Sequence, residues 1–302
     1  MIDLDAVLAL RAIATHGSVV AAADALDFTP SAVSQQIKRL ERSTGVPLLE
    51  RVGRGVVLTQ HGRHLVDSSA ALLAGLEELE SGLHRQARTV AGRLRVTTFS
   101  TAMRGLVAPV VRGVLDAHPE LSVTLSEREP WDTVDLVATD RADLGIVHRW
   151  GDVPLAVPDH LVLTPLADDL ADVVLHRDHP LAGRDRLRPA DLVEEGWIAT
   201  SRSTICRQWL ERMYVGTGHP PRIVHESAEF DSHLAMARAR LGIALVPRLG
   251  RAPIGPDLCA VPVHDPVPLR RVLAVHRRSM ASSPALGVVL EALAAGPVGT
   301  AP

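Results

Sequence analysis

The chain has 302 residues, of which 46% are apolar and 22% are charged, and its formal net charge is −3 at pH 7. This length allows two or three domains, and the composition is typical of a soluble globular protein, which excludes a disordered chain. The charge is unevenly spread: residues 1 to 66 hold seven Lys or Arg against six Asp or Glu, a balance of +1, which leaves −4 for the remainder. A near-neutral head on an acidic body indicates a modular protein.

Other patterns argue against a metal site, export and membrane insertion. The two cysteines, Cys206 and Cys259, are far apart and belong to no Cys/His cluster, so we predict no structural zinc site and no other metal or cofactor. Asp3 and Asp5 stand where a signal peptide would be basic, and no run of about 18 apolar residues is present. We therefore expect a cytoplasmic protein with no membrane segment.

A helix-turn-helix pattern lies near the start of the chain. Ser18 is a good N-cap for a small-sided helix to Leu26, and Thr29 with Pro30 predicts a second helix that runs to about Ser43. In that helix Val33, Ile37 and Leu40 recur at spacings of four and three, which predicts one buried stripe. The outward side chains are then Ser31, Ser34, Gln35 and Lys38. Ser and Gln can hydrogen-bond base edges, and Lys can pair with phosphate or guanine.

The alternative is a solvated face on an ordinary helical hairpin, but the residues that follow favour DNA. Between Lys38 and Arg63 there are six Lys or Arg and only two Glu, which should attract phosphates. Arg51 and Arg54 flank Gly53 in a turn between two apolar runs, 46–49 and 56–58, which predicts a β-wing. The residues predicted to bind DNA are Thr29, Pro30, Ser31, Ser34, Gln35, Lys38, Arg51 and Arg54.

Residues 60 to about 88 contain no proline and predict one long helix. Its apolar seam follows a heptad spacing through Leu65, Ser69, Leu72, Leu76, Leu79, Leu83 and Gln86. Such a seam indicates dimerisation through the five leucines. The alternative is an amphipathic helix that faces the protein's own core.

From Gly92 onward the pattern changes to alternating strands and helices. We predict strands at 93–99, 121–127, 144–147, 173–175, 197–199, 222–225, 243–246 and 271–276, and helices at 103–118, 132–140, 207–215, 231–239 and 284–295. The βαβαβ order at the start implies a parallel sheet with helices on its faces. Two α/β units joined by two crossings fit this order, and so does a single doubly wound domain.

The head resembles the LysR-type transcriptional regulators. The residues that carry the resemblance are Gly17, Ser18, Ala21, Ala22, Ala23, Leu26, Thr29, Pro30, Ser31, Ala32, Val33, Ser34, Ile37, Leu40, Glu41, Leu48, Arg51, Arg54, Leu58, Thr59 and Gly62. Two departures stand out: the commoner pattern has Gln and Pro where this chain has Pro30 and Ser31, and often Phe in place of Leu49. Because the first departure alters a base-contacting position, a relative's target sequence cannot be transferred.

The resemblance implies an α/β protein with a winged helix-turn-helix at 1–59, a linker and dimerisation helix at 60–89, and a two-lobed effector domain at 90–302. That domain would resemble type 2 periplasmic binding proteins, with lobe I at about 90–160 and 268–302 and lobe II at about 161–267. The implied partners are double-stranded DNA, a small effector, a second copy in a homodimer or homotetramer, and RNA polymerase. Two heads in a dimer can read two half-sites of an operator.

Candidate effector residues follow two of the predicted strands. Ser100 and Thr101 follow the first strand, and Thr200 and Ser201 follow the strand at Trp197, where helix N-termini and hydroxyls favour a small anion. These residues could equally be N-caps, but the family's inducer contacts fall on the same two segments. The other candidates are His148 as a cation and Trp131 and Phe230 as aromatic contacts, although aromatic residues are more often part of a core.

Catalysis is not predicted. The sequence has no GxSxG, HExxH, GxxxxGK[ST] or GxGxxG motif, and Cys206 at a predicted helix start, where a thiolate would be favoured, is weak evidence alone. A free solute-binding protein is disfavoured by the head. We therefore expect a DNA-binding regulator controlled by a small anionic effector; a regulator of the same architecture without an effector is the alternative.

Overall fold

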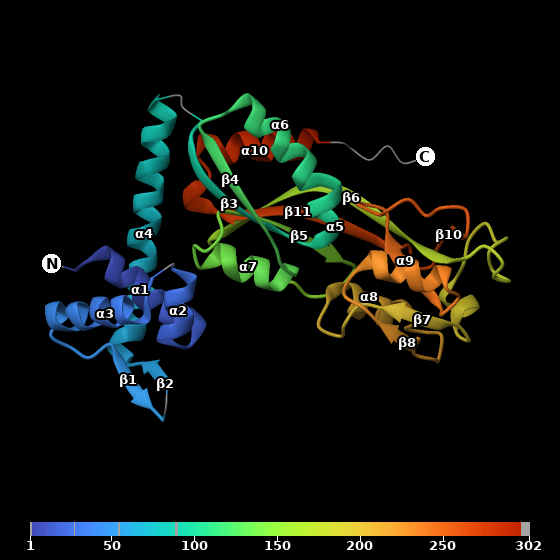
Figure 1. The fold of residues 1–302 in the computed structure, drawn as a ribbon, viewed down its shortest axis with the longest axis horizontal. Coiled ribbons are helices and arrows are strands. Elements are labelled where there is room, and N and C mark those ends of the chain that lie inside the picture. The colour runs from blue at the N-terminus through green and yellow to red at the C-terminus, as the bar shows by residue number, and fades with distance from the viewer. Residues whose placement is uncertain (1, 27, 54, 88–89, 297–302) are drawn as a thin grey trace. The chain divides into compact units, whose positions relative to one another are not determined.

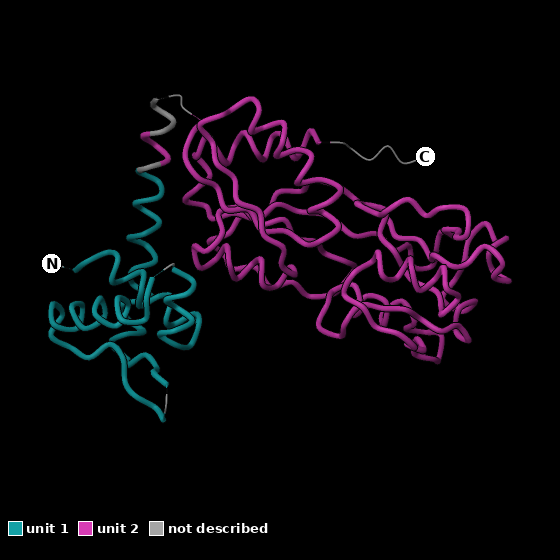
Figure 2. The backbone as a smooth tube through the Cα atoms, viewed as in Figure 1, with its two compact units in different colours: residues 1–80 teal, residues 81–302 magenta. Residues whose placement is uncertain are grey.

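The computed structural model describes residues 2–26, 28–53, 55–87 and 90–296. The chain divides into two compact units, residues 1–80 and 81–302, coloured separately in Figure 2. Unit 1 contains α1 (Leu4–His16), α2 (Val19–Ala25), α3 (Pro30–Thr44), β1 (Leu49–Val52) and β2 (Gly55–Leu58), and most of α4 (Gln60–Ala87) (Figure 1).

The two predicted caps of the helix-turn-helix are confirmed. The Ser18 hydroxyl accepts a hydrogen bond from the Ala21 amide at 3.1 Å, and the Thr29 hydroxyl accepts one from the Ala32 amide at 3.2 Å. The helix that Thr29 caps ends at Gly45, whose φ of 72° is left-handed and favours glycine. Local chemistry therefore sets both ends of α3.

The core of unit 1 is formed by one face of each of its first three helices. The predicted stripe on α3, Val33, Ile37 and Leu40, is buried against α1 and against the small residues Ala22 and Ala23 of α2. Small side chains allow two helices to approach closely. This packing leaves the opposite face of α3 to solvent.

The wing is a two-stranded antiparallel sheet in which Leu49 pairs with Leu58. Its first strand, Leu49–Val52, overlaps the apolar run 46–49 only at Leu49 and includes Arg51 and Val52, which were predicted as part of the turn. The reason is the Glu41 carboxylate of α3, which accepts hydrogen bonds from the amides of Leu48 at 2.8 Å and Leu49 at 3.2 Å and so turns the chain into the wing. Gly62 completes the junction, because a Cβ there would lie 2.2 Å from the Leu48 carbonyl oxygen.

Replacing Glu41 with Ala should destabilise the head by about 1–3 kcal/mol, because two partly buried amides lose their acceptor. All four tryptophans lie in unit 2, so tryptophan fluorescence reports unit 2 and far-UV circular dichroism reports both units. In urea, the dichroism transition of the full chain should move while the fluorescence transition stays. Glu50→Ala, an exposed wing carboxylate, is the control; equal shifts in both variants would contradict the assigned role of Glu41.

Unit 2 is an α/β domain (Figure 1). Its strands are β3 (Gly92–Thr98), β4 (Leu121–Glu127), β5 (Leu144–Trp150), β6 (Leu161–His176), β7 (Gly196–Ala199), β8 (Arg222–Glu226), β9 (Ile243–Pro247), β10 (Leu258–Pro262) and β11 (Leu269–Arg277). Its helices are α5 (Ser100–Ala102), a π-helical turn (Met103–Val107), α6 (Ala108–Ala117), α7 (Pro130–Ala138), α8 (Ile205–Met213), α9 (Phe230–Arg238) and α10 (Pro284–Ala295), with 3₁₀ turns at Pro189–Leu192 and Arg278–Met280.

The strands form two parallel groups joined by an antiparallel pair. The strand order is β4-β3-β5-β11-β6-β9-β7-β8, with β10 paired to β6. Strand β3 is parallel to β4 and β5, which with α5, α6, α7 and α10 form lobe I; β7 is parallel to β8 and β9, which with β10, α8 and α9 form lobe II. The structure therefore has the two-lobed architecture.

Strands β6 and β11 cross between the lobes. The first part of β6 pairs with β11, ending at Leu170 opposite Leu269, and from Ala171 onward β6 pairs with β9 and β10. Each lobe has an apolar cluster of its own, and a third cluster, which includes Trp150, Val173 and Trp197, spans both. Only residues 173–175 of β6 were predicted as strand, and β10 was not predicted.

Among the described residues, no single helix is long and apolar enough to span a membrane. In the part of the chain that the structure describes, α1 and α2 together reach that length and composition, but the pair is bent by 116°.

Candidate functional site

Helix α3 presents the predicted polar residues to solvent. The exposed ones are Thr29, Pro30, Ser31, Gln35 and Lys38, and Ser34 is half-buried. Arg51 is exposed on β1, and Arg54 lies outside the described residues. One face of α3 and the first wing strand therefore offer hydroxyl, amide and cationic groups of the kinds that contact bases and phosphates.

The cations of this head are available to an external anion. No carboxylate among the described residues forms an ion pair with Lys38, Arg39 or Arg51. Arg42 donates to the Lys38 carbonyl at 3.1 Å and Arg63 to the Leu58 carbonyl at 2.6 Å, contacts that leave both charges unneutralised. Such cations release counterions when they bind phosphates.

Helix α4 carries a row of exposed leucines along the predicted seam. The exposed fractions are 58% for Leu72, 37% for Leu76, 61% for Leu79 and 57% for Leu83. Leu65 differs, because it is half-buried against the core of unit 1, as the core-facing alternative predicted. Ser69 is buried there too, and the Gln86 side chain lies outside the described residues. The unpartnered part of the seam thus runs from Leu72 to Leu83.

In unit 2, the first pair of predicted effector residues follows β3. Ser100 is half-buried at the start of α5, and Thr101 is 1% exposed. The Thr101 hydroxyl accepts a hydrogen bond from Nη2 of Arg270 at 2.6 Å. Arg270 lies on the crossing strand β11 and is itself 1% exposed. The hydroxyl predicted from sequence is therefore held by a buried arginine that sequence reasoning missed.

Arg270 is a buried cation of this region. Its Nε lies 2.7 Å from the Asp169 carboxylate on β6, and its guanidinium sits 5.0 Å from the Phe99 ring centre and 5.8 Å from that of Trp150. One signal could have revealed it. Arg270 and Arg271 are adjacent in an apolar strand, so one of the two must point inward.

His148 does not have the predicted cationic role. It lies within β5 and not beyond it, is 1% exposed, and packs edge-on against Phe99 and Trp150. Burial, and secondly the positive charge of Arg270, hold the pKa of His148 well below its ordinary value. The imidazole is therefore neutral at physiological pH, and Arg270 supplies the positive charge.

The second pair of predicted residues follows β7 on lobe II. The Thr200 hydroxyl lies 2.7 Å from the Thr204 hydroxyl, whose oxygen caps α8. Ser201 is half-buried and its hydroxyl lies 3.0 Å from that of Ser203, so Ser201 belongs to a local turn. Thr200 and the buried Phe230 line a cavity of about 10 Å³, together with Trp150, Cys206 and His233.

Trp131 lies apart from this cavity. Its indole Nε1 donates to the Pro154 carbonyl at 3.2 Å, and its ring packs against the core. This is the core role that aromatic residues usually have. Of the seven predicted effector residues, the structure brings Thr101, His148, Thr200 and Phe230 near Arg270 and Trp150. Ser100, Trp131 and Ser201 do not line the small cavity or contact Arg270.

Two polar atoms of side chains that line the small cavity have no hydrogen-bond partner among the described residues: Nε1 of Trp150 and Nδ1 of His233. The His233 Nε2 lies 2.9 Å from the Ser227 carbonyl, so Nε2 carries the proton and Nδ1 is a free acceptor. Burial lowers the pKa of His233 despite this bond, which keeps the ring neutral. A buried donor and a buried acceptor without partners are costly, so these two atoms need polar partners that the described residues do not supply.

Cys206 is not a reactive thiol. Although it lies at the second residue of α8, burial raises its pKa to about 12, and the positive charge of Arg270 offsets this only in part. The thiolate that a redox or nucleophilic role requires is therefore scarce at neutral pH. No group of three or more His, Cys, Asp or Glu in the described part of the chain could hold a metal ion.

Comparison with known proteins agrees with this architecture. Residues 4–63 match the model of the bacterial regulatory helix-turn-helix protein of the lysR family, and residues 87–297 match the LysR substrate binding domain. The chain therefore belongs to the LysR family and is a DNA-binding transcriptional regulator.

Relatives cover most of the chain. The hydrogen peroxide-inducible genes activator of Pectobacterium carotovorum is 25% identical, and the alignment covers 89% of this chain and 88% of that protein. The RuBisCO operon transcriptional regulator of Allochromatium vinosum is 28% identical, and the alignment covers 78% of this chain and 76% of that protein. A full-length OxyR from Pseudomonas aeruginosa superposes with a TM-score of 0.75 at 20% identity, covering 99% of this chain and 97% of that one. Full-length CbnR complexed with its target DNA superposes with a TM-score of 0.56 at 19% identity, covering 97% of this chain and 99% of that one. These structures share the fold.

Proposed function

We propose that the chain binds its operator as a homodimer or homotetramer through α3 and the wing, and that a small effector held between lobes I and II controls the response. The free cations and outward polar residues of the head support the DNA part. The exposed leucines of α4 support the dimer, since an apolar row of this kind is stabilised by a second helix.

The DNA contacts are tested with Arg51→Ala. This variant should weaken binding to all sequences and reduce the salt dependence by about one unit of slope, because one phosphate contact is lost. Gln35→Ala should instead relax base preference. Gel shifts over a salt series measure both effects, with Arg271→Ala, an exposed arginine of unit 2, as the control. An unchanged slope for Arg51→Ala would remove the wing from the interface.

One observation carries the effector proposal: a buried cation and two unpartnered polar atoms gather where the lobes join. Arg270 holds Thr101 on the lobe I side and lies near Trp150, which lines the same small cavity as Thr200 and His233 of lobe II. Groups from both lobes at one place suit a ligand that links lobe closure to binding.

We infer that the effector is a small anion, as expected from the strand-to-helix turns, with Arg270 in the role first given to His148. Asp169 balances the Arg270 charge, and its other oxygen accepts from the Leu249 amide at 2.9 Å. An anion that competes with Asp169 for Arg270 would loosen this contact between β6, β11 and the loop after β9. The two lobe arrangements would then differ in affinity for the effector, which shifts their populations and changes how the heads act toward RNA polymerase at the promoter.

Thermal shift with a panel of small organic acids tests the effector. An acid at 100 times its dissociation constant should stabilise the full chain by about 2.7 kcal/mol. Thr101→Val and Thr200→Val should reduce that shift while operator binding persists, and Ser122→Ala, exposed on β4, is the control. An acid that shifts Thr101→Val and Thr200→Val as much as the unmodified chain would place the effector elsewhere.

The name of one group of relatives raises peroxide sensing as a second candidate function. The residues of this chain give it no support, because the Cys206 pKa is raised to about 12 and the thiol is therefore a poor nucleophile. We do not propose it.

A further inference from the structure

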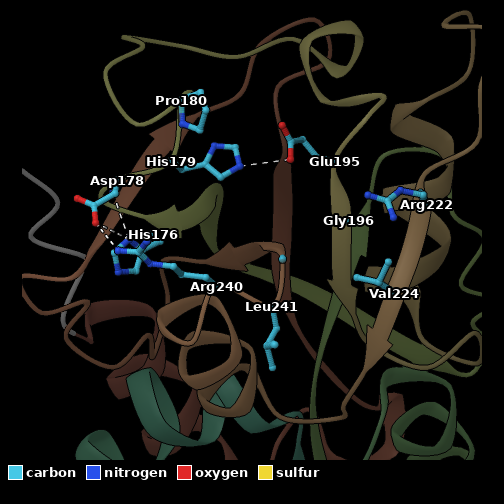
Figure 3. Close-up of a pocket in the computed structure, with 11 residues that line it drawn as sticks. His176, Asp178, His179, Pro180, Glu195, Gly196, Arg222, Val224, Arg240 and Leu241 are labelled. Atoms are coloured by element: carbon cyan, nitrogen blue, oxygen red, sulfur yellow. Dashed lines mark hydrogen bonds and ion pairs between the residues drawn. The ribbon is translucent and has the colours of Figure 1, made fainter.

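A larger cavity lies at the amino-terminal ends of the lobe II strands, opposite the ends that carry Thr200. Strands β7, β8 and β9 are parallel, and Thr200 follows the carboxyl end of β7, whereas Gly196 begins that strand. A pocket of about 410 Å³ lies beside Gly196, Arg222 and Gly242, at or just before the starts of β7, β8 and β9 (Figure 3). The pocket is therefore separate from the proposed effector site, and its volume suits a small molecule.

Two glycines shape this pocket. A Cβ at Gly242 would lie 2.5 Å from the Gly196 carbonyl oxygen, and φ at Gly242 is +156°. A Cβ at Gly196 would lie 3.0 Å from Val224 and 3.4 Å from Nη2 of Arg222. Glycine at both positions thus lets the strand starts approach each other and leaves the Arg222 guanidinium room beside the backbone.

The histidines of the pocket present N–H groups and not lone pairs. Nδ1 of His176 accepts from the Asp178 amide at 3.1 Å, and Nδ1 of His179 accepts from the Leu181 amide at 3.2 Å. With Nδ1 accepting, each ring presents an N–H at Nε2. That of His179 donates to Glu195 at 3.2 Å, while no described residue accepts from that of His176.

The charges that line the pocket leave one cation without a carboxylate. Arg240 pairs with Asp178, and Glu195 is engaged by His179 (Figure 3). Arg222 donates to the backbone carbonyl of Glu194 at 3.1 Å, and no carboxylate in the described part of the chain forms an ion pair with it. The positive charge of Arg222 is thus available to an anion.

Apolar side chains line the same pocket as this cation. Val224 is 38% exposed and Leu241 is 48% exposed, and both line the pocket together with Pro180. Exposed apolar side chains in the same pocket as an unpaired guanidinium match a molecule that has an acidic group on an apolar body.

We propose that this pocket binds a small organic acid, with its carboxylate on Arg222 and its apolar body against Val224 and Leu241. It is a second ligand site on lobe II. The proposal does not depend on an effector between the lobes.

Calorimetric titration of the full chain with phenylacetate tests the site. We expect saturable binding at millimolar concentration, and binding at least about tenfold weaker for the uncharged phenylacetamide and for Arg222→Gln, because each removes a charge-assisted pair. Leu241→Ser should weaken binding about fivefold through lost apolar contact. Arg186→Gln, an exposed arginine outside the pocket lining, is the matched control and should bind normally.

Binding that does not saturate, or that is equal for the acid and its amide, would overturn the proposal. Equal affinity in Arg222→Gln would also overturn it, and weaker binding in Thr101→Val would then show that the acid occupies the site between the lobes. The methyl chemical shifts of Val224 and Leu241 in the unmodified chain test the site without any substitution that could affect folding. Both shifts should change when phenylacetate is added. If neither shift changes, the acid does not bind at this pocket.

Discussion

Leu76→Asp should convert the oligomer to monomers and weaken operator binding by at least about 100-fold. If α4 pairs with its symmetry mate, the substitution places a carboxylate in an apolar seam without a partner, at a cost of several kcal/mol. A monomer has one head and reads only one half-site, so operator affinity falls with the dimer. Light scattering and gel shifts of the same samples measure both changes.

Ala71→Asp is the matched control for this variant. Ala71 is exposed on the same helix but outside the seam, so the same charge there should leave the oligomer intact. If Leu76→Asp leaves the mass of the oligomer unchanged, the exposed leucines are not the dimer contact.

Arg270→Met should destabilise unit 2 by about 3–5 kcal/mol, because it leaves the Asp169 carboxylate buried without its cation. The side chains are only 1% and 5% exposed, so water cannot compensate. Arg271→Met is the control on the next residue of the strand: its side chain is 73% exposed and 4.0 Å from Asp168, and a change within about 0.5 kcal/mol is expected. Urea unfolding followed by tryptophan fluorescence measures both.

A second substitution separates charge from packing at the same place. Asp169→Asn keeps an acceptor for the Leu249 amide but removes the negative charge, so it should recover much of the stability in the Arg270→Met background. If the double variant is as unstable as Arg270→Met alone, the loss comes from the missing guanidinium contacts with Phe99 and Trp150.

The head was predictable because its signals are local. Ser18, Thr29 and Gly45 fix helix ends through bonds to residues a few positions away, and the stripe from Val33 to Leu40 follows from helix periodicity alone. The family match confirms the winged helix-turn-helix and the LysR class. The start of the wing was misplaced because the bond that sets it, from Glu41, spans seven residues.

Unit 2 was less predictable because its site depends on pairing between distant residues. The first part of β6 mixes Pro165, Asp168 and Asp169 with apolar residues, and its strand conformation comes from pairing with β11 about a hundred positions later. The role of Arg270 depends on the same pairing, since its partners Thr101 and Asp169 lie far away in sequence. His148 was assigned a charge that only its burial could rule out.

The crossing strands have a mechanical consequence. Lobes joined by two flexible loops can swing freely, but here β6 and β11 remain paired from Leu161 opposite Arg277 to Leu170 opposite Leu269, with one irregularity near Val272. Hydrogen-bonded strands cannot separate without losing those bonds, whereas the twist between neighbouring strands varies over a range of angles. If the lobes move relative to one another, the paired strands favour twisting over separation, and the proposed effector beside Arg270 would act by changing that twist.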